Sequence, residues 1–336
     1  HGELIFLAAE YHRFTGDEET ARRVWPAVRR AAAYIDTLRA QRRTPEWREP
    51  GREHFYGLLP PSISHEGYSA KPMHSYWDDL WALRGLKDAV YLAEALDFAG
   101  DAAALDASRR EFEADLRASI AAALRVHGID FIPGAADLGD FDATSTTIAL
   151  TPVAATGILP EGALERTFER YWEFFRERRD GKPWDAFTPY ETRSIGSFVR
   201  LGWRDRANEA LTYFLRHRQP PVWRQWPEVV WSDSVTQRFI GDLPHSWCGS
   251  DFVRSALDML AYTDEEAGTL VLAAGAPADW LAGEPGIRVE NLPTTLGRLS
   301  YSAGLRGDTV EMRVESGVRV PPGGIIRDPP LTGTEG

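Results

Sequence analysis

One repeated feature constrains the fold of this chain more than any other: amphipathic helical segments follow one another down to about residue 262. Apolar residues recur at intervals of three and four, so that Trp25, Val28 and Ile35 share one face of a helix. Short turns join the segments in pairs. Because each helical hairpin needs a neighbour to bury its apolar face, the hairpins are expected to close into a toroid or stack into a solenoid.

The pattern predicts nine or ten helices, and the nine clearest occupy residues 3–15, 18–42, 75–99, 102–126, 143–157, 161–178, 188–202, 204–217 and 245–262. Longer segments rich in Pro, Gly and Trp separate the pairs, notably 43–74 and 219–244. Loops gathered at one end of a rigid scaffold are where functional sites are commonly built. The long segments are therefore the place to search for chemistry.

The hydrophobic period changes at residue 269. Short apolar runs separated by Gly and Pro predict strands at 270–272, 287–289, 299–301 and 310–314. We therefore expect a mainly α chain with three parts: a helical domain over 1–264, a small C-terminal β domain over 265–326 and a disordered tail over 327–336.

Composition excludes several classes of function. The chain carries 50 acidic against 38 basic residues, a balance that argues against nucleic acid or an anionic membrane as partner. No apolar run approaches the roughly 20 residues that span a membrane. The single cysteine, Cys248, excludes an intrachain disulfide framework, and no Cys/His cluster has zinc spacing. We expect neither a metal nor a cofactor.

The chain begins at His1, in a segment that already has helical spacing and no cap. We therefore expect upstream residues in the parent protein, including any targeting signal. The localisation stays open: a soluble protein is expected, cytoplasmic or secreted with its signal outside this chain.

Carboxylates gather in four loop segments, at 65–79, 139–145, 183–193 and 223–247, and all but the second also contain some of the 12 tryptophans. Indole faces stack on the apolar faces of sugar rings, while carboxylates and imidazoles hydrogen-bond the hydroxyls. A pocket of this kind suits a carbohydrate. Hydrolysis of a glycosidic bond then needs two carboxyl groups, one that donates a proton and one that stays ionised.

Five carboxylates are candidates for this pair: Glu66, Asp140, Asp142, Glu191 and Glu228. Glu228 has the weakest structural explanation, because an ionised group in a loop crowded by tryptophans is costly without a purpose. Asp140 and Asp142 equally suit N-caps, and Glu191 equally suits the first turn of a helix.

The motifs resemble those of the six-hairpin glycosidases, whose catalytic domain is an (α/α)6 toroid. The Tyr-Trp-Asp at 76–78 is similar to a trehalase signature, and the Trp-Asp at 184–185 resembles a later element of that family. The Trp-Pro-Glu at 226–228, followed by His-Ser-Trp at 245–247, resembles segments of the α-L-rhamnosidases. Their chain likewise ends in a small β domain.

The resemblance implies that Glu228 is the general base and that Asp140 or Asp142 is the acid, with Glu66 and Glu191 still open. It implies that Trp77 and Asp78 hold a sugar in the innermost subsite, with Trp184, Asp185 and Trp247 lining the pocket. The loop segments themselves add further candidate carbohydrate ligands: His74, Asp79, Tyr190, Arg193, Trp226 and His245. A toroid of this family has twelve helices. We therefore expect one hairpin to be missing at the front, and an N-terminal segment of the same protein to pack on the toroid.

The leading interpretation is an inverting glycoside hydrolase that removes a terminal sugar from an oligosaccharide, polysaccharide or glycoconjugate. A polysaccharide lyase on the same toroid is the second, with His65, Tyr68, His74 and Arg193 as possible parts. The third is a carbohydrate-binding module without catalysis.

Overall fold

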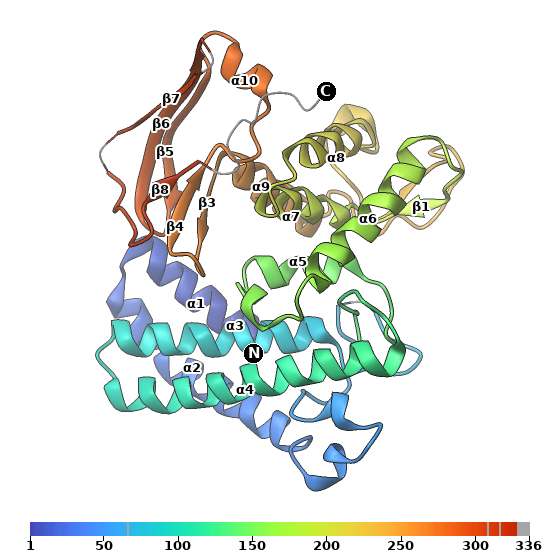
Figure 1. Cartoon of the computed structure of the whole chain (residues 1–336), viewed down its shortest axis with the longest axis vertical. Helices are drawn as coiled ribbons and strands as arrows, with labels where there is room; N and C mark the ends of the chain where they lie inside the picture. The colour runs from blue at the N-terminus through green and yellow to red at the C-terminus, as the bar shows by residue number, and fades with distance from the viewer. Residues whose placement is uncertain (66, 308, 316, 328–336) are drawn as a thin grey trace. The chain divides into compact units, whose positions relative to one another are not determined.

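The structure of the protein, a computed structural model, describes residues 1–65, 67–307, 309–315 and 317–327. Within these residues the chain is mainly helical, with small sheets concentrated toward the C-terminus (Figure 1). This confirms the prediction of a mainly α chain. The chain divides into two compact units, His1–Thr167 and Phe168–Gly336, which we call the first and the second unit.

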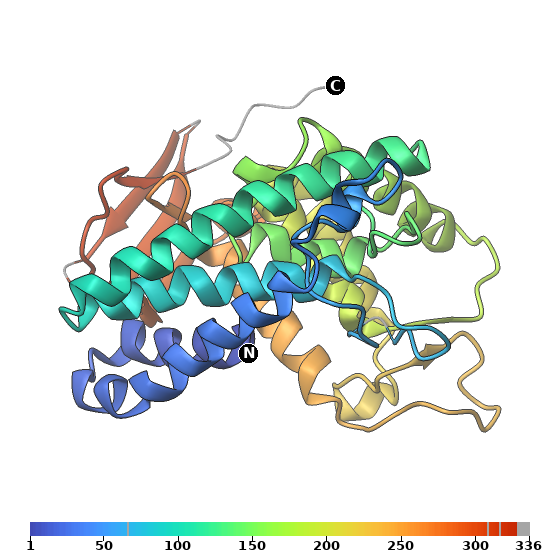
Figure 2. The same ribbon diagram turned by 90° about the horizontal axis from the view of Figure 1, so that it is seen from below.

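Two helical hairpins and a shorter helix build the first unit: α1 (Gly2–Thr15), α2 (Glu18–Ala40), α3 (Tyr76–Ala95), α4 (Ala99–His127) and α5 (Ala143–Leu150). Gly16 ends α1 in a left-handed conformation, and Asp17 caps α2 by accepting the N–H of Thr20 at 2.9 Å. α3 and α4 lie side by side in both views (Figures 1 and 2). The predicted helix over 143–157 is shorter than expected, because Pro152 follows its end at Leu150.

The packing of α1 on α3 depends on glycine at the contact. A Cβ atom added to Gly85 would lie 2.6 Å from the Cα of Gly2, and one added to Gly2 would lie 1.9 Å from the backbone oxygen of Trp81. The two backbones are therefore in direct contact, and Ile5 and Ala9 of α1 are fully buried. The larger apolar residues on the other side of α1, which are Leu4, Leu7, Tyr11 and Phe14, stay exposed.

The helices of the second unit are α6 (Ala163–Arg179), which begins just before the division, α7 (Arg193–Arg200), α8 (Arg204–Arg216) and α9 (Ser246–Leu260). α7 packs against both α8 and α9. Aromatic rings join α6 to α7, since the rings of Phe168 and Tyr171 have centroids 6.3 and 6.0 Å from that of Phe198. Among the described residues, no helix combines the length and the apolar content needed to cross a membrane.

Strands of the second unit form three small sheets: β1 (Ala186–Phe187) with β2 (Val230–Trp231); β3 (Ala261–Asp264), β4 (Thr269–Leu272) and β8 (Ile325–Ile326); and β5 (Ile287–Thr294), β6 (Gly297–Arg306) and β7 (Thr309–Val314), with the short helix α10 (Ala278–Ala282) between β4 and β5. β4 and β8 are parallel, and the other pairs are antiparallel. Leu299, Tyr301 and Ala303 of β6 alternate into the core.

These strands confirm the predicted change of period after residue 269. One expectation was wrong: residues 261–262 were assigned to the last helix, but β3 begins at Ala261 and pairs with β4. The proposed domain boundary at 264 stays a prediction, and residues 328–336 of the predicted tail lie outside the described residues.

We predict that Gly85→Ala lowers the free energy of unfolding by roughly 1–3 kcal/mol, because the added methyl group forces the backbones of α1 and α3 apart. Denaturant unfolding measures this loss. Gly100→Ala in α4 is the matched control, since a Cβ there meets no atom within 4 Å and alanine favours a helix. Equal stabilities of the two variants would contradict the direct backbone contact.

Candidate functional site

The first turn of α3 carries the Trp-Asp pair that the sequence singled out. Trp77 is 6% exposed and its ring stacks on that of His65, with centroids 4.3 Å apart. The Asp78 carboxylate accepts hydrogen bonds from the hydroxyls of Ser62 and, at 3.0 Å, of Ser64. The segment before α3 therefore folds back over the start of the helix and fixes both side chains.

Asp140 lies in the same unit, in the loop before α5. Its Oδ2 accepts the hydroxyl proton of Tyr68 at 2.9 Å, and its Oδ1 accepts the backbone N–H of Ala135 at 2.9 Å. A Cβ atom on Gly134 would lie 3.0 Å from Asp140 Oδ2 and 3.1 Å from the Cβ of Asp142. The structure thus brings the two candidate acids together around a glycine.

Asp142 is the N-cap of α5, the structural alternative that the sequence left open. Its Oδ1 accepts the backbone N–H of Ser145 at 3.1 Å and the hydroxyl of Thr144 at 2.6 Å. Its Oδ2 accepts the hydroxyl of Ser145 at 2.6 Å. The carboxylate therefore satisfies an N–H that would otherwise lack a partner at the start of the helix.

We predict that Asp142→Ala lowers the free energy of unfolding by about 1 kcal/mol, because the cap of α5 is lost. Asp142→Asn should unfold close to the wild type, since an amide oxygen still accepts the N–H of Ser145. Thermal unfolding of the two variants separates them. Equal destabilisation by both substitutions would mean that the negative charge, and not the cap, is what the helix requires.

Two of the predicted sugar ligands, Asp79 and His74, are buried in the interior of the first unit. Asp79 is fully buried and accepts the backbone N–H of Leu59 at 2.9 Å. His74 is also buried, where its Nε2 accepts from Arg42 Nε at 3.0 Å and its Nδ1 donates to Asp137 Oδ2 at 3.1 Å. Both side chains hold the segment before α3 in place and do not reach the surface.

Burial raises the pKa of the Asp79 carboxyl well above its ordinary value of 3.8, an effect that the neighbouring Asp78 reinforces. The folded chain consequently holds this proton more tightly than the unfolded chain does. Stability is then lost as the pH rises above about 4, where the unfolded carboxyl has already ionised.

We predict that Asp79→Asn, which carries no charge at any pH, gains stability relative to the wild type as the pH rises from 4 to 7. The amide retains an oxygen that can accept the N–H of Leu59. Urea unfolding at several pH values measures the difference between the two proteins. A difference that stays constant over this range would contradict the raised pKa.

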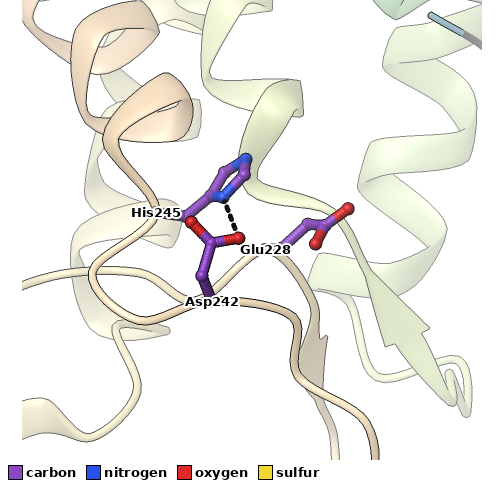
Figure 3. A group of neighbouring side chains, drawn as sticks. All are labelled: Glu228, Asp242 and His245. Atoms are coloured by element: carbon purple, nitrogen blue, oxygen red, sulfur yellow. Dashed lines mark hydrogen bonds and ion pairs between the residues drawn. The ribbon is translucent and has the colours of Figure 1, made fainter.

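The second unit brings together Glu228, Asp242 and His245 (Figure 3). His245 is the residue before α9, and its Nδ1 lies 2.9 Å from Asp242 Oδ1. Glu228 lies beside this pair, in the segment that leads into β2. One side-chain atom of each residue falls within 4.8 Å of the others. The hydrogen bond from His245 lowers the pKa of the Asp242 carboxyl below its ordinary value.

Main-chain hydrogen bonds hold the three residues together. The N–H of Glu228 donates to the carbonyl of Asp242 at 3.3 Å, and the N–H of His245 donates to the carbonyl of Trp226 at 3.1 Å. Gly241 has a φ of +67°, and a Cβ there would lie 2.1 Å from Glu228 Oε2. Only glycine therefore lets the chain pass so close to the Glu228 carboxylate.

Aromatic side chains surround this cluster. The hydroxyl of Tyr190 lies 2.7 Å from His245 Nε2, and the ring of Tyr190 contacts that of Trp247 edge to face at 5.3 Å. Trp247 is 40% exposed. The Arg193 guanidinium lies 4.8 Å from the Tyr190 ring and pairs with Asp251 at 2.7 Å. Four predicted ligands, Tyr190, Arg193, His245 and Trp247, are thus neighbours of one another.

Trp226, another tryptophan of the segment 223–247, is buried. Its ring contacts Phe252 at 4.9 Å, and its indole N–H donates to the carbonyl of Phe214 at 3.1 Å. In this arrangement Trp226 anchors the Glu228 segment to α8 and α9 and does not offer a surface to a sugar.

Glu191, a predicted catalytic candidate, is buried in an ion pair. Arg178 donates to both of its oxygens at 2.9 and 2.6 Å, and the hydroxyl of Tyr171 donates to Oε2 at 2.7 Å. These contacts give Glu191 a structural explanation, because the buried Arg178 needs an opposite charge. Burial and the Glu191 carboxylate raise the pKa of the Tyr171 hydroxyl well above its ordinary value.

The two residues of the Trp-Asp element, Trp184 and Asp185, lie in different surroundings. Asp185 is exposed and pairs with Arg238 at 2.8 Å. Trp184 is half-buried, and its ring contacts those of Phe187 at 5.6 Å and His217 at 5.8 Å. Glu66, the last of the predicted acids, lies outside the described residues.

Sequence reasoning did not select Asp242. A signal was present, since Asp242 stands three residues before His245, close enough along the chain for the two side chains to meet.

Glu228, Asp242 and His245 are also residue types that bind divalent metals. The expectation that the protein needs no metal stays a prediction.

Comparison with solved structures finds a similar fold in the crystal structure of a GH78-family rhamnosidase from Bacillus sp. GL1, with a TM-score of 0.51 and 17% sequence identity. The match covers 96% of this chain and 32% of the rhamnosidase chain, so the chain spans about a third of that protein's length. At this identity the likeness concerns the fold alone. No protein-family model matches the sequence, and no curated protein matches it significantly.

Proposed function

We propose that the protein is a glycoside hydrolase that removes a terminal sugar from an oligosaccharide, polysaccharide or glycoconjugate with inversion. The observation that carries the proposal is the Glu228 carboxylate beside the hydrogen-bonded His245–Asp242 pair. The distant likeness in fold to a GH78 rhamnosidase supports the same class of reaction. Rhamnosides are therefore the first substrates to test.

The proposed architecture is an (α/α)6 toroid of the kind found in six-hairpin glycosidases, including trehalase-like enzymes. The nine helices from α1 to α9 account for most of its twelve, and an N-terminal segment of the same protein would supply further ones. In such a toroid the loops between hairpins form the substrate site. In the proposal Asp78, in the first turn of α3, and Trp247, in the first turn of α9, are sugar ligands, and Glu228 is the base.

Glu228 is the proposed general base. Its carboxylate takes a proton from the water that attacks the sugar, and inversion follows because the water arrives on the face opposite the leaving group. With Nδ1 of His245 donating to Asp242, its Nε2 is left to accept the Tyr190 hydroxyl. Because both ring nitrogens of His245 are hydrogen-bonded, the proposal makes it a positioning residue that lines the sugar site beside Glu228.

The proposed acid is Asp140 or Asp142. An oxygen of each carboxylate contacts a hydroxyl group, from Tyr68 for Asp140 and from Ser145 for Asp142. A hydroxyl accepts as readily as it donates, so either carboxyl group can gain a proton and keep this contact. Asp140 is the first choice, because Asp142 also caps a helix.

We predict that Glu228→Gln lowers kcat/KM for an aryl rhamnoside by about 10²–10⁴-fold, the usual contribution of a general base. Sugar binding should persist, because the amide keeps the size and polarity of the side chain. Steady-state kinetics measures the loss, and proton NMR of the first-formed product gives its anomeric configuration. Glu173→Gln, an exposed position on α6, is the matched control and should keep wild-type activity.

A Glu228→Gln enzyme whose kcat/KM is within a few-fold of the wild-type value would contradict the assignment of the base.

The Tyr190–His245 hydrogen bond of 2.7 Å favours one further candidate function, a polysaccharide lyase with Tyr190 as base. A lyase releases an unsaturated sugar that absorbs in the ultraviolet. Formation of that product from a uronate-containing polysaccharide, without hydrolysis, would decide for the lyase.

A further inference from the structure

A cavity of about 490 Å³ lies within the second unit, among the C-terminal halves of α6 and α8 and the segment before β1. We call it the α6–α8 cavity, and its lining includes Arg178, Trp184, Glu209, Tyr213, Arg216 and His217. Its volume falls within the usual range for small-molecule sites. Neither Glu228 nor any other member of the proposed hydrolytic pair lines it.

The charge that lines the α6–α8 cavity is positive. Arg178 is neutralised by Glu191, and Arg179 pairs with Glu209 and, at 2.8 Å, with Asp180. Arg216 is exposed and has no ion-pair partner within the described residues. One guanidinium is therefore left without a counter-charge at the cavity wall. A guanidinium binds a planar carboxylate through two parallel hydrogen bonds.

Aromatic rings make up the rest of the wall. Trp184 is half-buried, and the rings of Tyr213 and His217 stack with centroids 4.0 Å apart. Tyr213 is 8% exposed, and its ring lies 5.3 Å from the Arg178 guanidinium. These rings give the cavity an apolar wall against which the face of a sugar ring can pack.

His217 adds a directional acceptor. Its Nδ1 lies 2.8 Å from the carbonyl of Tyr213 and donates to it, which leaves Nε2 as an acceptor when the ring is neutral. The cavity wall therefore offers a cation, an indole ring and an acceptor for a hydroxyl group. A compound with a carboxylate, an apolar ring face and hydroxyl donors matches all three.

We propose that the α6–α8 cavity binds a sugar acid, with the carboxylate on Arg216 and the ring against Trp184. The β1–β2 pair joins this cavity to the loop of Glu228, because Trp184 comes two residues before β1 and Glu228 two residues before β2. An acidic sugar bound here contacts the segment before β1, and β1 pairs with the strand that follows the proposed base. The binding itself does not require hydrolysis.

Titration of the full chain with D-glucuronate, followed by calorimetry and saturation-transfer NMR, tests the proposal. D-glucose is the neutral counterpart, and acetate supplies the carboxylate without a ring. We expect glucuronate to bind more tightly than either, with an affinity that falls as salt is added. Equal binding of glucose would overturn the proposed role of Arg216, and equal binding of acetate would reduce the site to a simple anion site.

Variants locate the binding. Arg216→Gln should weaken glucuronate binding about tenfold, as expected for loss of a hydrogen bond between charged groups. Arg176→Gln removes the same charge from the last turn of α6, outside the cavity lining, and should bind glucuronate as the wild type does. Trp184→Ala should weaken binding of the whole sugar. Indistinguishable affinities of the two arginine variants would overturn the proposal.

Glu228→Gln separates this inference from the proposed hydrolysis. If both proposals hold, this variant loses hydrolysis and still binds glucuronate with wild-type affinity. If it hydrolyses normally while Arg216→Gln has lost glucuronate binding, the assignment of the base fails and the cavity proposal stands. A loss of glucuronate binding in Glu228→Gln would place the ligand at the hydrolytic site and overturn the cavity proposal.

Discussion

Buried arginine–carboxylate pairs are the interaction on which the helical packing of both units depends. In the first unit Arg39 of α2 is 1% exposed and lies 3.0 Å from Asp115 of α4. In the second unit the buried Asp258 of α9 accepts two hydrogen bonds of 3.0 Å from the half-buried Arg200 of α7. Apolar faces alone tolerate sliding of one helix along another. A buried charge tolerates no such shift, because a lost partner leaves it uncompensated.

The same rule explains why one predicted catalyst turned out to have a structural partner. Glu191 was attractive from the sequence because it stands in a loop beside Trp184 and Asp185. Its partner, Arg178, is the cation that enters the protein interior at the end of α6. The pairing could not be read from spacing, since it depends on how the chain returns between α6 and α7. A carboxylate near tryptophans is therefore as well explained by a buried arginine as by a substrate.

Hydrophobic periodicity predicted most of the helices, but it did not locate all of their ends. The apolar residues at intervals of three and four predicted the ends of α1 to α4 to within four residues, because the buried face of an amphipathic helix is visible in its sequence. The strand at Ala261 was missed because it follows α9 with no Gly or Pro between them. At the start of α3, Trp77 and Asp78 were selected together, and the segment before the helix contacts both side chains. Asp79, the next residue, points into the core because successive positions on a helix face different sides.

The candidate site of the second unit depends on backbone geometry that cannot be predicted from residue types. Glu228 and His245 are 17 positions apart, and they meet because the chain turns back through Gly241 and closes onto Trp226. β1 and β2 then tie this turn to the wall of the α6–α8 cavity. A substitution in this two-stranded sheet would disturb both places at once. The β1–β2 pair therefore couples the proposed hydrolysis at Glu228 to the proposed binding of a sugar acid beside Trp184.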